Sequence, residues 1–502
     1  MAIMPRVPLL VILALCAASA APRGAIASST DSVRGSSARG VVLIIVDALR
    51  YDRVGASTPV IERFAKGASV FTAARSQAPW SLPSATSLFT SMHPSRHGMI
   101  NRYVDFSADP LVLARLGQVR PEARTIGEVF REAGWKTAAF TGGAGFAGES
   151  GLSAGFDVYD DSPTFSGFDR TAPLALRWLS SLKPDDKFFL IVHGYDVHPY
   201  HPGRLNPEML ALHKKLREER LDGKPTEATE AQKKILIDSY DHAVEAMDKR
   251  LEPLLKELAE VKYRNTLVAL LADHGEELFD RGGVDHGSTL YEELIHVPLI
   301  VRLPRPGSPR IDAPVRLVDL MPTLLDYAGV APDFSLGAQM DGLSLRPLIE
   351  GHPLALDSFA ETDFLLSSSL RSVVTRDGWK AVLDRTSGRV ELYRLSDDPG
   401  ERRDLAGEKP ELAQKLGERL SGSWSAKGLA AEGVRRGIWK ALRLGGRTQL
   451  YDLSADPYLL DDLAEKKKDL ALDLGVEFAR QPSEDHKPSE ALRRKLREAG
   501  YW

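Results

Sequence analysis

Apolar runs and amphipathic segments alternate along the chain from about residue 40 onward. Five apolar runs predict buried strands, at residues 41–46, 137–141, 188–192, 266–271 and 297–301. Residues 125–133, closed by Gly134, and residues 231–258, with apolar positions three and four apart, predict helices. Alternation of this kind predicts an α/β fold, in which a mostly parallel sheet carries helices on both faces.

Polar side chains follow three of the predicted strands directly. Asp47 comes after the first strand, residues 193–198 with two histidines come after the third, and Asp273 and His274 come after the fourth. In open α/β sheets, ligands bind beyond the carboxyl ends of the strands. We therefore expect these side chains to converge on one site.

The strand ends offer a carboxylate and imidazole set of the kind that binds Zn²⁺ or Mn²⁺. Asp47 taken alone is equally well explained as a helix cap, but Asp273 with His274 at a facing strand end favours a metal site. Residues 79–90 predict a turn that leads into a helix capped by Ser84, which would place Ser81 near helix N–H groups that favour tetrahedral anions. A hydroxyl beside a metal is a candidate nucleophile, because the metal lowers its pKa.

Several longer motifs accompany these residues in a fixed order. They are His93-Pro94-Ser95-Arg96-His97-Gly98, residues 125–161, residues 193–200, Tyr291-Glu292-Glu293 with residues 297–299, and residues 317–326. With them the chain resembles the sulfatase family of the alkaline phosphatase superfamily over roughly residues 40–410. The resemblance implies an alkaline-phosphatase-like fold and a metal-dependent ester hydrolase that acts on an anionic substrate.

The resemblance also implies roles for single residues. Asp47, Asp273, His274 and the Ser81 oxygen would hold the metal, and Ser81 would be the nucleophile. Two further histidines would bind the anion or protonate the leaving group, a transfer that suits imidazole because its pKa lies near neutrality. These are His198 and His286, each of which has a structural role as its alternative, whereas His193, His201 and His242 are expected to be structural.

Two positions depart from the family pattern. Sulfatases typically carry an aspartate pair at the first strand end, but the second position here is Ala48, which removes an oxygen that Ca²⁺ would want and favours one Zn²⁺ or Mn²⁺. The alternative is a second ion held by Asp196, His198 and His286. Sulfatases also need arginine in the motif that converts Cys or Ser to formylglycine, and Ala85 stands in that place. An unmodified Ser81 fits a phosphoserine intermediate better than a serine sulfate.

Three functions are compatible with these residues. The leading one is hydrolysis of a sulfate or phosphate ester, with a small-molecule, glycan-linked or lipid-linked anionic substrate. The second is a phosphodiesterase or phosphoryl-group transferase of the cell envelope, although such transferases usually carry membrane spans. The third is a non-catalytic binding protein on a sulfatase scaffold, which retention of both the metal residues and the nucleophile argues against.

The N-terminus predicts export. An apolar run, too short to span a bilayer, ends in Ala18-Ser19-Ala20, the small-x-small form of a signal-peptidase site. We expect a signal peptide at 1–20, a flexible linker at 21–39 and a secreted or periplasmic protein, with lipid anchoring at Cys16 as the alternative. Cys16 is the only cysteine, so metal ligands must be oxygen or nitrogen. A net charge of −4 with mixed signs argues against a nucleic-acid partner.

The remaining sequence divides into two parts. Residues 40–350 are expected to form the sulfatase-like catalytic domain, in which the charged stretch 203–227 is an insertion that either lies over the site or forms a solvated helix. Residues 351–502 are expected to form a smaller, structural α+β domain. A motif of Trp-Lys, Leu-Tyr, Asp-Pro and Leu-Ala begins at Trp379 and again at Trp439, and each copy predicts a hairpin followed by a turn and a helix.

Overall fold

The computed structural model describes a defined part of the chain. The described residues are 37–99, 119, 122–199, 201, 203–221, 224, 226–305, 307, 309–364, 368–421, 463, 466 and 467, with the backbone of 432–436, 439–444 and 447–452. The predicted signal peptide and almost all of the predicted linker lie outside them. All described residues except Ser37 belong to the unit Ala38–Trp502.

Eight strands form the main sheet. They are β1 (Gly40–Val46), β2 (Ser69–Phe71), β4 (Lys136–Phe140), β5 (Val158–Asp160), β6 (Phe188–Gly194), β7 (Thr266–Ala272), β10 (Leu299–Arg302) and β11 (Arg310–Ile311). Their order is β11-β2-β10-β7-β1-β6-β4-β5. Strands β7, β1, β6, β4 and β5 are mutually parallel, and β10 runs antiparallel to both β7 and β2. All five predicted strands are confirmed, and the sheet is mostly parallel as predicted.

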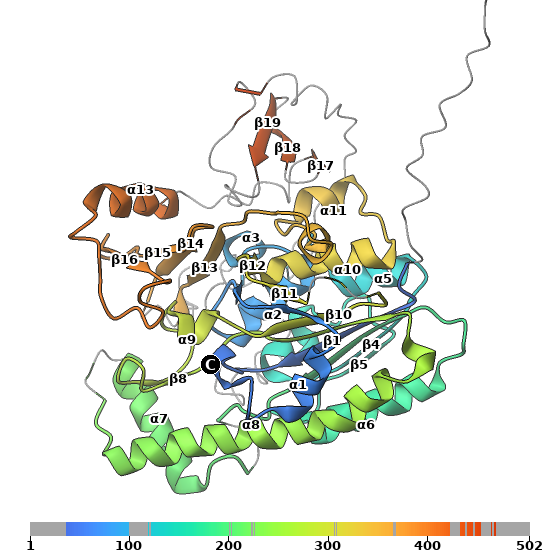
Figure 1. Ribbon diagram of the computed structural model, residues 1–502, viewed down its shortest axis with the longest axis horizontal. Helices are drawn as coiled ribbons and strands as arrows, with labels where there is room; N and C mark the ends of the chain where they lie inside the picture. The colour runs from blue at the N-terminus through green and yellow to red at the C-terminus, as the bar shows by residue number, and fades with distance from the viewer. Residues whose placement is uncertain are drawn as a thin grey trace, which may run out of the picture. The chain divides into compact units, whose positions relative to one another are not determined.

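Helices cover both faces of this sheet (Figure 1). One face carries α1 (Pro59–Ala65), α6 (Phe168–Ser181) and α8 (Glu230–Leu258), and the other carries α2 (Ser81–Thr90), α5 (Ile126–Glu132) and α10 (Leu320–Ala328). Both predicted helices are confirmed, and each begins with a capping box, Thr125 with Glu128 in α5 and Thr229 with Gln232 in α8. The strands and helices between them bury one large apolar core.

Shorter elements complete the first part of the chain. They are β3 (Ala74–Arg75), β8 (Glu277–Leu278), β9 (Val284–Asp285), β12 (Val315–Arg316), α3 (Pro94–His97), α7 (Pro207–Leu221), α9 (Glu292–Ile295), α11 (Phe334–Gln339) and α12 (Arg346–Ile349). Helix α7 is the core of the charged insertion. Among the described residues, no helix has the length and apolarity that crossing a membrane requires.

The C-terminal part is rich in antiparallel strands. Strands β13 (Ser358–Thr362), β14 (Leu370–Val374), β15 (Trp379–Asp384) and β16 (Val390–Arg394) pair in sequence order, and α13 (Pro410–Ser421) packs on them over a small separate core. Strands β17 (Glu432–Arg436), β18 (Trp439–Leu444) and β19 (Arg447–Asp452) form a second antiparallel sheet.

The two hairpins of the predicted repeat have matching registers. Lys380 of β15 lies opposite Tyr393 of β16, and Lys440 of β18 lies opposite Tyr451 of β19. The first copy continues into α13 as predicted. The helix predicted for the second copy, and the side chain of Trp439, lie outside the described residues.

Candidate active site

The carboxyl ends of three neighbouring strands bring the predicted acidic residues together. Val46 at the end of β1 is in register with Gly194 of β6 on one side and Ala272 of β7 on the other. Asp47 and Asp273 therefore leave the sheet at the same level, and both are fully buried. The backbone N–H of Ala48 donates to Asp273 Oδ1 at 3.3 Å, which ties the two strand ends to each other.

Ser81 is the first residue of α2, and the predicted cap at Ser84 is wrong. The helix begins after Trp80, whose extended backbone holds the cap position without a capping side chain. Ser84 lies one turn inside the helix, where its hydroxyl donates to the backbone oxygen of Asp273 at 2.7 Å. The fully buried Ser81 thus lies at the helix N-terminus, where unpaired N–H groups favour negative charge.

The Ser81 hydroxyl lies between an aspartate and a histidine. Its Oγ donates to Asp47 Oδ2 at 2.8 Å and lies 3.2 Å from His274 Nε2. His274 Nδ1 is 2.7 Å from the backbone oxygen of Gly275, which accepts its proton and leaves the lone pair on Nε2. Nε2 is 3.8 Å from Asp47 Oδ2 and 3.7 Å from Asp273 Oδ2.

The electrostatics of this cluster are unbalanced. Burial, and then the charge of Asp273, raises the pKa of Asp47 well above its ordinary value, and burial raises the pKa of Asp273. Burial lowers the pKa of His274 to about 4, so the imidazole is neutral near pH 7. Asp47 Oδ1 and Asp273 Oδ2 are buried without a hydrogen-bond partner among the described residues.

This arrangement fits a bound divalent cation. Ligand atoms of Asp47, Asp273 and His274 all lie within 4.8 Å of one another. Within the described ranges, no Lys or Arg side chain comes within 4.0 Å of either aspartate. Two buried carboxylates with partnerless oxygens are costly unless a cation compensates them. The chemistry of the donor set and its orphan oxygens therefore both point to a metal.

The two predicted anion-binding histidines border the same cluster. The ring of His286 lies 4.5 Å from the ring of His274 and 5.3 Å from the ring of His198, centroid to centroid. His198 stacks on Phe165 at 5.0 Å, and burial, then His286, lowers the pKa of His198 well below its ordinary value. The structure thus brings together all six residues predicted for the site.

Comparisons with known proteins identify the family of this chain. The family model described as Sulfatase matches residues 39–330. The chain belongs to the sulfatase family. The Delta 4,5-hexuronate-2-O-sulfatase of Bacteroides thetaiotaomicron is 29% identical over 195 residues, which are 36% of this chain and 39% of that protein. The match therefore spans well under half of the relative's length.

Solved structures show that other sulfatase-like proteins share the fold. A putative sulfatase from Bacteroides thetaiotaomicron superposes with a TM-score of 0.59 at 20% identity, covering 90% of this chain and 98% of that one. The phosphonate monoester hydrolase of Agrobacterium radiobacter gives a TM-score of 0.58 at 19% identity, covering 76% of this chain and 94% of that one.

The alternative second metal site of this sulfatase-family chain is not assembled as predicted. Asp196 Oδ1 accepts from Arg250 at 2.7 Å and Asp196 Oδ2 accepts from the Phe168 N–H at 2.8 Å, so its charge is already compensated. His286 Nδ1 instead lies 3.3 Å from carboxylate oxygens of both Glu276 and Asp285. The prediction failed because the partners of Asp196 come from distant segments.

The three histidines expected to be structural make structural contacts. His193 stacks on Phe146 at 3.8 Å, His201 Nδ1 is 3.0 Å from the Phe165 oxygen, and His242 Nδ1 is 2.6 Å from the Asp238 oxygen. His201 and His242 also line a pocket that was not predicted from the sequence.

The charged insertion contributes to the surroundings of the site. Arg217 of α7 pairs with Asp285, and Arg220 pairs with Glu277 and lies 3.2 Å from the Ser288 hydroxyl. The insertion therefore reaches the segment that carries His286, and the prediction of a purely solvated helix is wrong.

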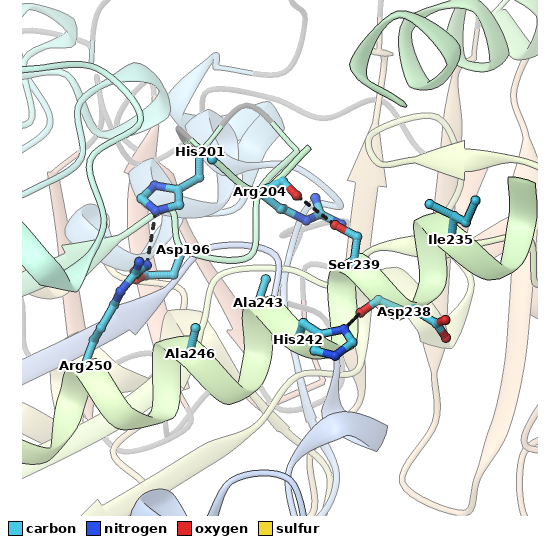
Figure 2. A pocket seen from close by; sticks show the side chains of 11 residues that line it. Asp196, His201, Arg204, Ile235, Asp238, Ser239, His242, Ala243, Ala246 and Arg250 are labelled. Atoms are coloured by element: carbon cyan, nitrogen blue, oxygen red, sulfur yellow. Dashed lines mark hydrogen bonds and ion pairs between the residues drawn. The ribbon is translucent and has the colours of Figure 1, made fainter. Parts of the chain in front are cut away.

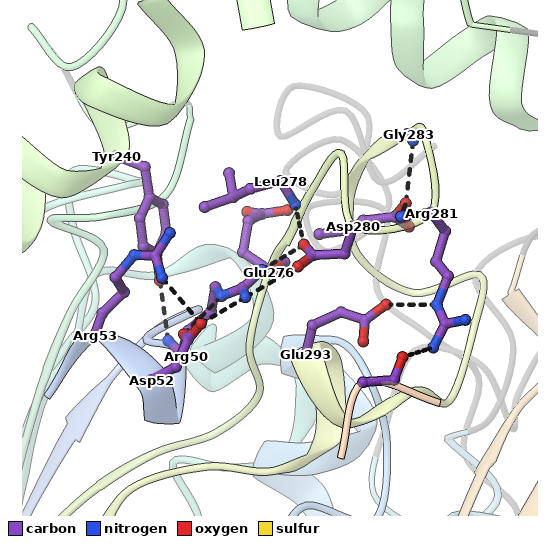
Figure 3. A network of polar contacts seen from close by, with 12 residues as sticks. Arg50, Asp52, Arg53, Tyr240, Glu276, Leu278, Asp280, Arg281, Gly283 and Glu293 are labelled. Carbon is purple, nitrogen blue, oxygen red and sulfur yellow. Dashed lines mark hydrogen bonds and ion pairs between the residues drawn. The ribbon is translucent and has the colours of Figure 1, made fainter. Parts of the chain in front are cut away.

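Arg50 ties the loops after β1 and β7 together (Figure 3). Its Nη1 donates to the backbone oxygen of Glu276 at 3.0 Å, and its Nη2 donates to Asp280 Oδ1 at 3.2 Å. The backbone N–H of Arg50 donates to the Tyr240 hydroxyl at 3.0 Å, and this hydroxyl donates to the backbone oxygen of Ala48 at 2.7 Å. These bonds fix the backbone close to Asp47 and Asp273. Arg50 was not predicted to support the site, although it stands three residues after Asp47.

Proposed function

We propose that this protein hydrolyses a sulfate or phosphate ester, with Ser81 as the nucleophile. The observation that carries the proposal is the place of Ser81 Oγ, 2.8 Å from Asp47 Oδ2 and 3.2 Å from His274 Nε2 at a helix N-terminus. Membership of the sulfatase family supports the same reaction.

The residues of the cluster divide the work. Asp47 orients the Ser81 hydroxyl through the hydrogen bond it accepts, and His274 presents its Nε2 lone pair to the same oxygen. Asp47, Asp273, His274 and Ser81 would hold a divalent cation, which would supply positive charge that favours the ionised hydroxyl and the transferred anion. The N-terminus of α2 adds partial positive charge for the anion.

Two histidines serve the leaving-group side. His286 Nδ1 lies within 3.4 Å of Glu276 and Asp285 oxygens, an arrangement that orients an imidazole and holds a proton on it. We assign proton donation to His286. His198, which burial keeps neutral, serves as a hydrogen-bond donor to the anion.

The metal is proposed to be a single Zn²⁺ or Mn²⁺. Two carboxylates, one imidazole and one hydroxyl oxygen suit four-coordinate Zn²⁺ or Mn²⁺, whereas Ca²⁺ prefers six to eight oxygens. Metal analysis of purified protein should find about one equivalent, lost in His274→Ala. Bound Ca²⁺ or two equivalents per chain would contradict this assignment.

Phosphate ester hydrolysis is the second candidate, favoured by Ala85. The arginine of the modification motif is replaced there by a fully buried alanine inside α2, so we expect Ser81 to stay unmodified. A formylglycine hydrate expels sulfate through its second hydroxyl, whereas an unmodified serine ester must be hydrolysed by water. Paired aryl sulfate and aryl phosphate substrates, with a mass spectrum of the peptide that contains Ser81, separate the two candidates.

The decisive variant is Ser81→Ala. Turnover should fall by at least about a thousandfold, as is typical when a nucleophile is removed. Ser180→Ala, an exposed serine of α6, is the matched control and should retain activity. Turnover by Ser81→Ala close to that of the control would refute the proposed nucleophile.

We also propose export through the predicted signal peptide at residues 1–20. N-terminal sequencing of protein secreted by its host should begin after Ala20. A lipid-modified Cys16 at the N-terminus would support the anchored alternative instead.

A further inference from the structure

A pocket of about 550 Å³ is lined by Asp196 and His201, which stand on either side of His198 in the sequence. Its walls come from the segment after β6 and from one face of α8 (Figure 2). The helix contributes residues three and four positions apart, from Ile235 to Arg250, and the segment contributes Asp196, His201 and Arg204. A space of this size can hold a sugar ring or an aryl group.

Most charged and titratable groups in this pocket have partners within the protein. Arg250 pairs with Asp196 at 2.7 Å and lies 3.1 Å from His201 Nε2, and Asp238 pairs with Lys234 at 2.6 Å. The carboxylates that line the pocket are therefore compensated.

Arg204 is the exception. Its Nε and Nη1 are buried without a hydrogen-bond partner among the described residues, and no described carboxylate lies within 4.0 Å of it. The guanidinium lies over the Tyr240 ring at 5.3 Å, and burial lowers the pKa of Arg204 without discharging a group whose ordinary pKa is so high. A partly buried cation whose nitrogen atoms lack a counter-ion costs free energy that a bound anion would recover.

Arg204 also follows His198 by six residues on the segment after β6. The positive charge of Arg204 contributes to the lowered pKa of His198. The charge of Glu276, which lies next to His286, acts in turn to raise the pKa of Arg204. The guanidinium lines the pocket and is within electrostatic reach of the groups assigned to the leaving-group side. The organic part of an ester cleaved at Ser81 would extend toward it.

We propose that Arg204 binds a second anionic group, a carboxylate or a second sulfate, on the organic part of the substrate. The inference rests on the proposed ester hydrolysis and adds the substrate class: esters that carry two negative charges. A guanidinium suits either oxyanion, because its N–H groups can donate in parallel to two oxygens. Arg204 is thereby a specificity-determining residue.

The test compares three aryl esters: phenyl sulfate, 4-carboxyphenyl sulfate and benzene-1,4-disulfate, or the matching phosphates if those are the substrates cleaved. The wild-type kcat/KM should favour a doubly charged ester by about 10- to 100-fold, mainly through KM, as expected for hydrogen bonds to a charged group. In Arg204→Met this ratio should fall toward one, and Arg204→Lys should keep part of it. Which of the two esters is preferred identifies the oxyanion.

Controls separate this inference from the proposed function. Arg53→Met, which removes an ion pair with Asp241 outside the pocket, should keep the wild-type ratio. Calorimetry of 4-hydroxybenzoate and of phenol with the Ser81→Ala protein measures the affinity of the pocket for each ligand. This measurement needs no turnover, so it remains informative if no ester is cleaved. Equal binding of the two ligands, or an Arg204→Met protein with an unchanged substrate ratio, would overturn the inference.

Discussion

Two buried charge clusters in this protein show opposite electrostatics. The strand-end cluster consists of Asp47, Asp273 and His274. The balanced cluster consists of Arg75, Glu292, Lys380 and Glu401 and joins α9 to the C-terminal strands. Lys380 is fully buried and lies 3.0 Å from a Glu292 oxygen and 2.8 Å from a Glu401 oxygen. Arg75 lies 2.6 Å from the other Glu292 oxygen.

The difference lies in the source of the positive charge. Burial opposes the ionisation of Glu292, but the charges of Arg75 and Lys380 outweigh it and hold its pKa well below the ordinary value. Burial and the charge of Asp273 raise the pKa of Asp47, and the hydrogen bond from Ser81 lowers it only in part. The balanced cluster contains its own cations, whereas the described residues supply no Lys or Arg to the strand-end cluster, and we propose that a bound cation completes it.

The largest expected effect is that of Asp273→Asn. Turnover should fall by at least about a thousandfold, since the cation loses a charged ligand. The free energy of unfolding of the metal-free protein should stay equal or rise, because one of two repelling carboxylates is gone and the amide oxygen still accepts the backbone bonds. Urea denaturation in EDTA measures this. A clear loss of stability would mean that the strand-end cluster stabilises the fold, as the balanced cluster does, and would contradict its proposed role in metal binding.

The balanced cluster should respond in the opposite way. Lys380→Met leaves Glu401 and Glu292 short of positive charge, and breaking such a buried pair costs about 3–5 kcal/mol of unfolding free energy. Metal content per folded chain should not change. Lys415→Met, on the exposed side of α13, is the control and should change stability by less than about 0.5 kcal/mol. Equal effects of the two variants would contradict the role of Lys380.

Within the C-terminal sheet, Trp379→Ala tests the contribution of apolar packing to stability and leaves the buried charge pairs in place. Trp379 is half-buried against the small core and lies beneath Arg394 and Lys409. Its loss should cost about 2 kcal/mol, below the range of about 3–5 kcal/mol for a fully buried Trp. We predict that larger cost for Trp439→Ala if that side chain is fully buried. Thermal melts of both variants compare the two copies, and lost activity with an unchanged melting temperature would argue against a structural role.

The smallest effect concerns pH. Protons compete with the cation for Asp47 and Asp273, whose pKa values are raised, while His274, with a pKa of about 4, stays neutral over most of the range. Metal affinity should therefore fall by up to about tenfold per pH unit as pH is lowered through the carboxylate titration. The metal-free protein should change in the opposite sense and lose stability as pH rises through the raised pKa values. Calorimetric titrations from pH 8 to pH 5 measure the affinity, and a flat profile would contradict this account.

The strands and the residues that follow them could be predicted from the sequence, because buried parallel strands are continuous apolar runs and their polar ends stand directly after them. Asp47, Asp273 and His274 were found in this way. The cap at Ser84 was mispredicted, because the helix starts one turn earlier, after Trp80. Such a start depends on tertiary packing rather than on local preference.

Other residues were not predicted because their charge partners are distant in the sequence. Arg250 compensates Asp196 from 54 positions away, and Lys380 reaches Glu292 across 88 positions. Nothing local in the sequence marks which charges will be matched. The inference about substrate specificity rests on the lack of a hydrogen-bond partner for Arg204 Nε and Nη1 among the described residues. This lack becomes visible only when the ion pairs of the folded protein are known.

The backbone at Ala48 has a consequence for protein engineering. Its φ of 56° lies in the left-handed region, which aspartate and asparagine adopt more readily than most other residues. The backbone conformation at position 48 therefore suits the aspartate typical of sulfatases. Ala48→Asp would add a hard oxygen donor beside the two aspartates and shift the selectivity of the site toward Ca²⁺. One position thus makes the metal preference of this scaffold a designable property.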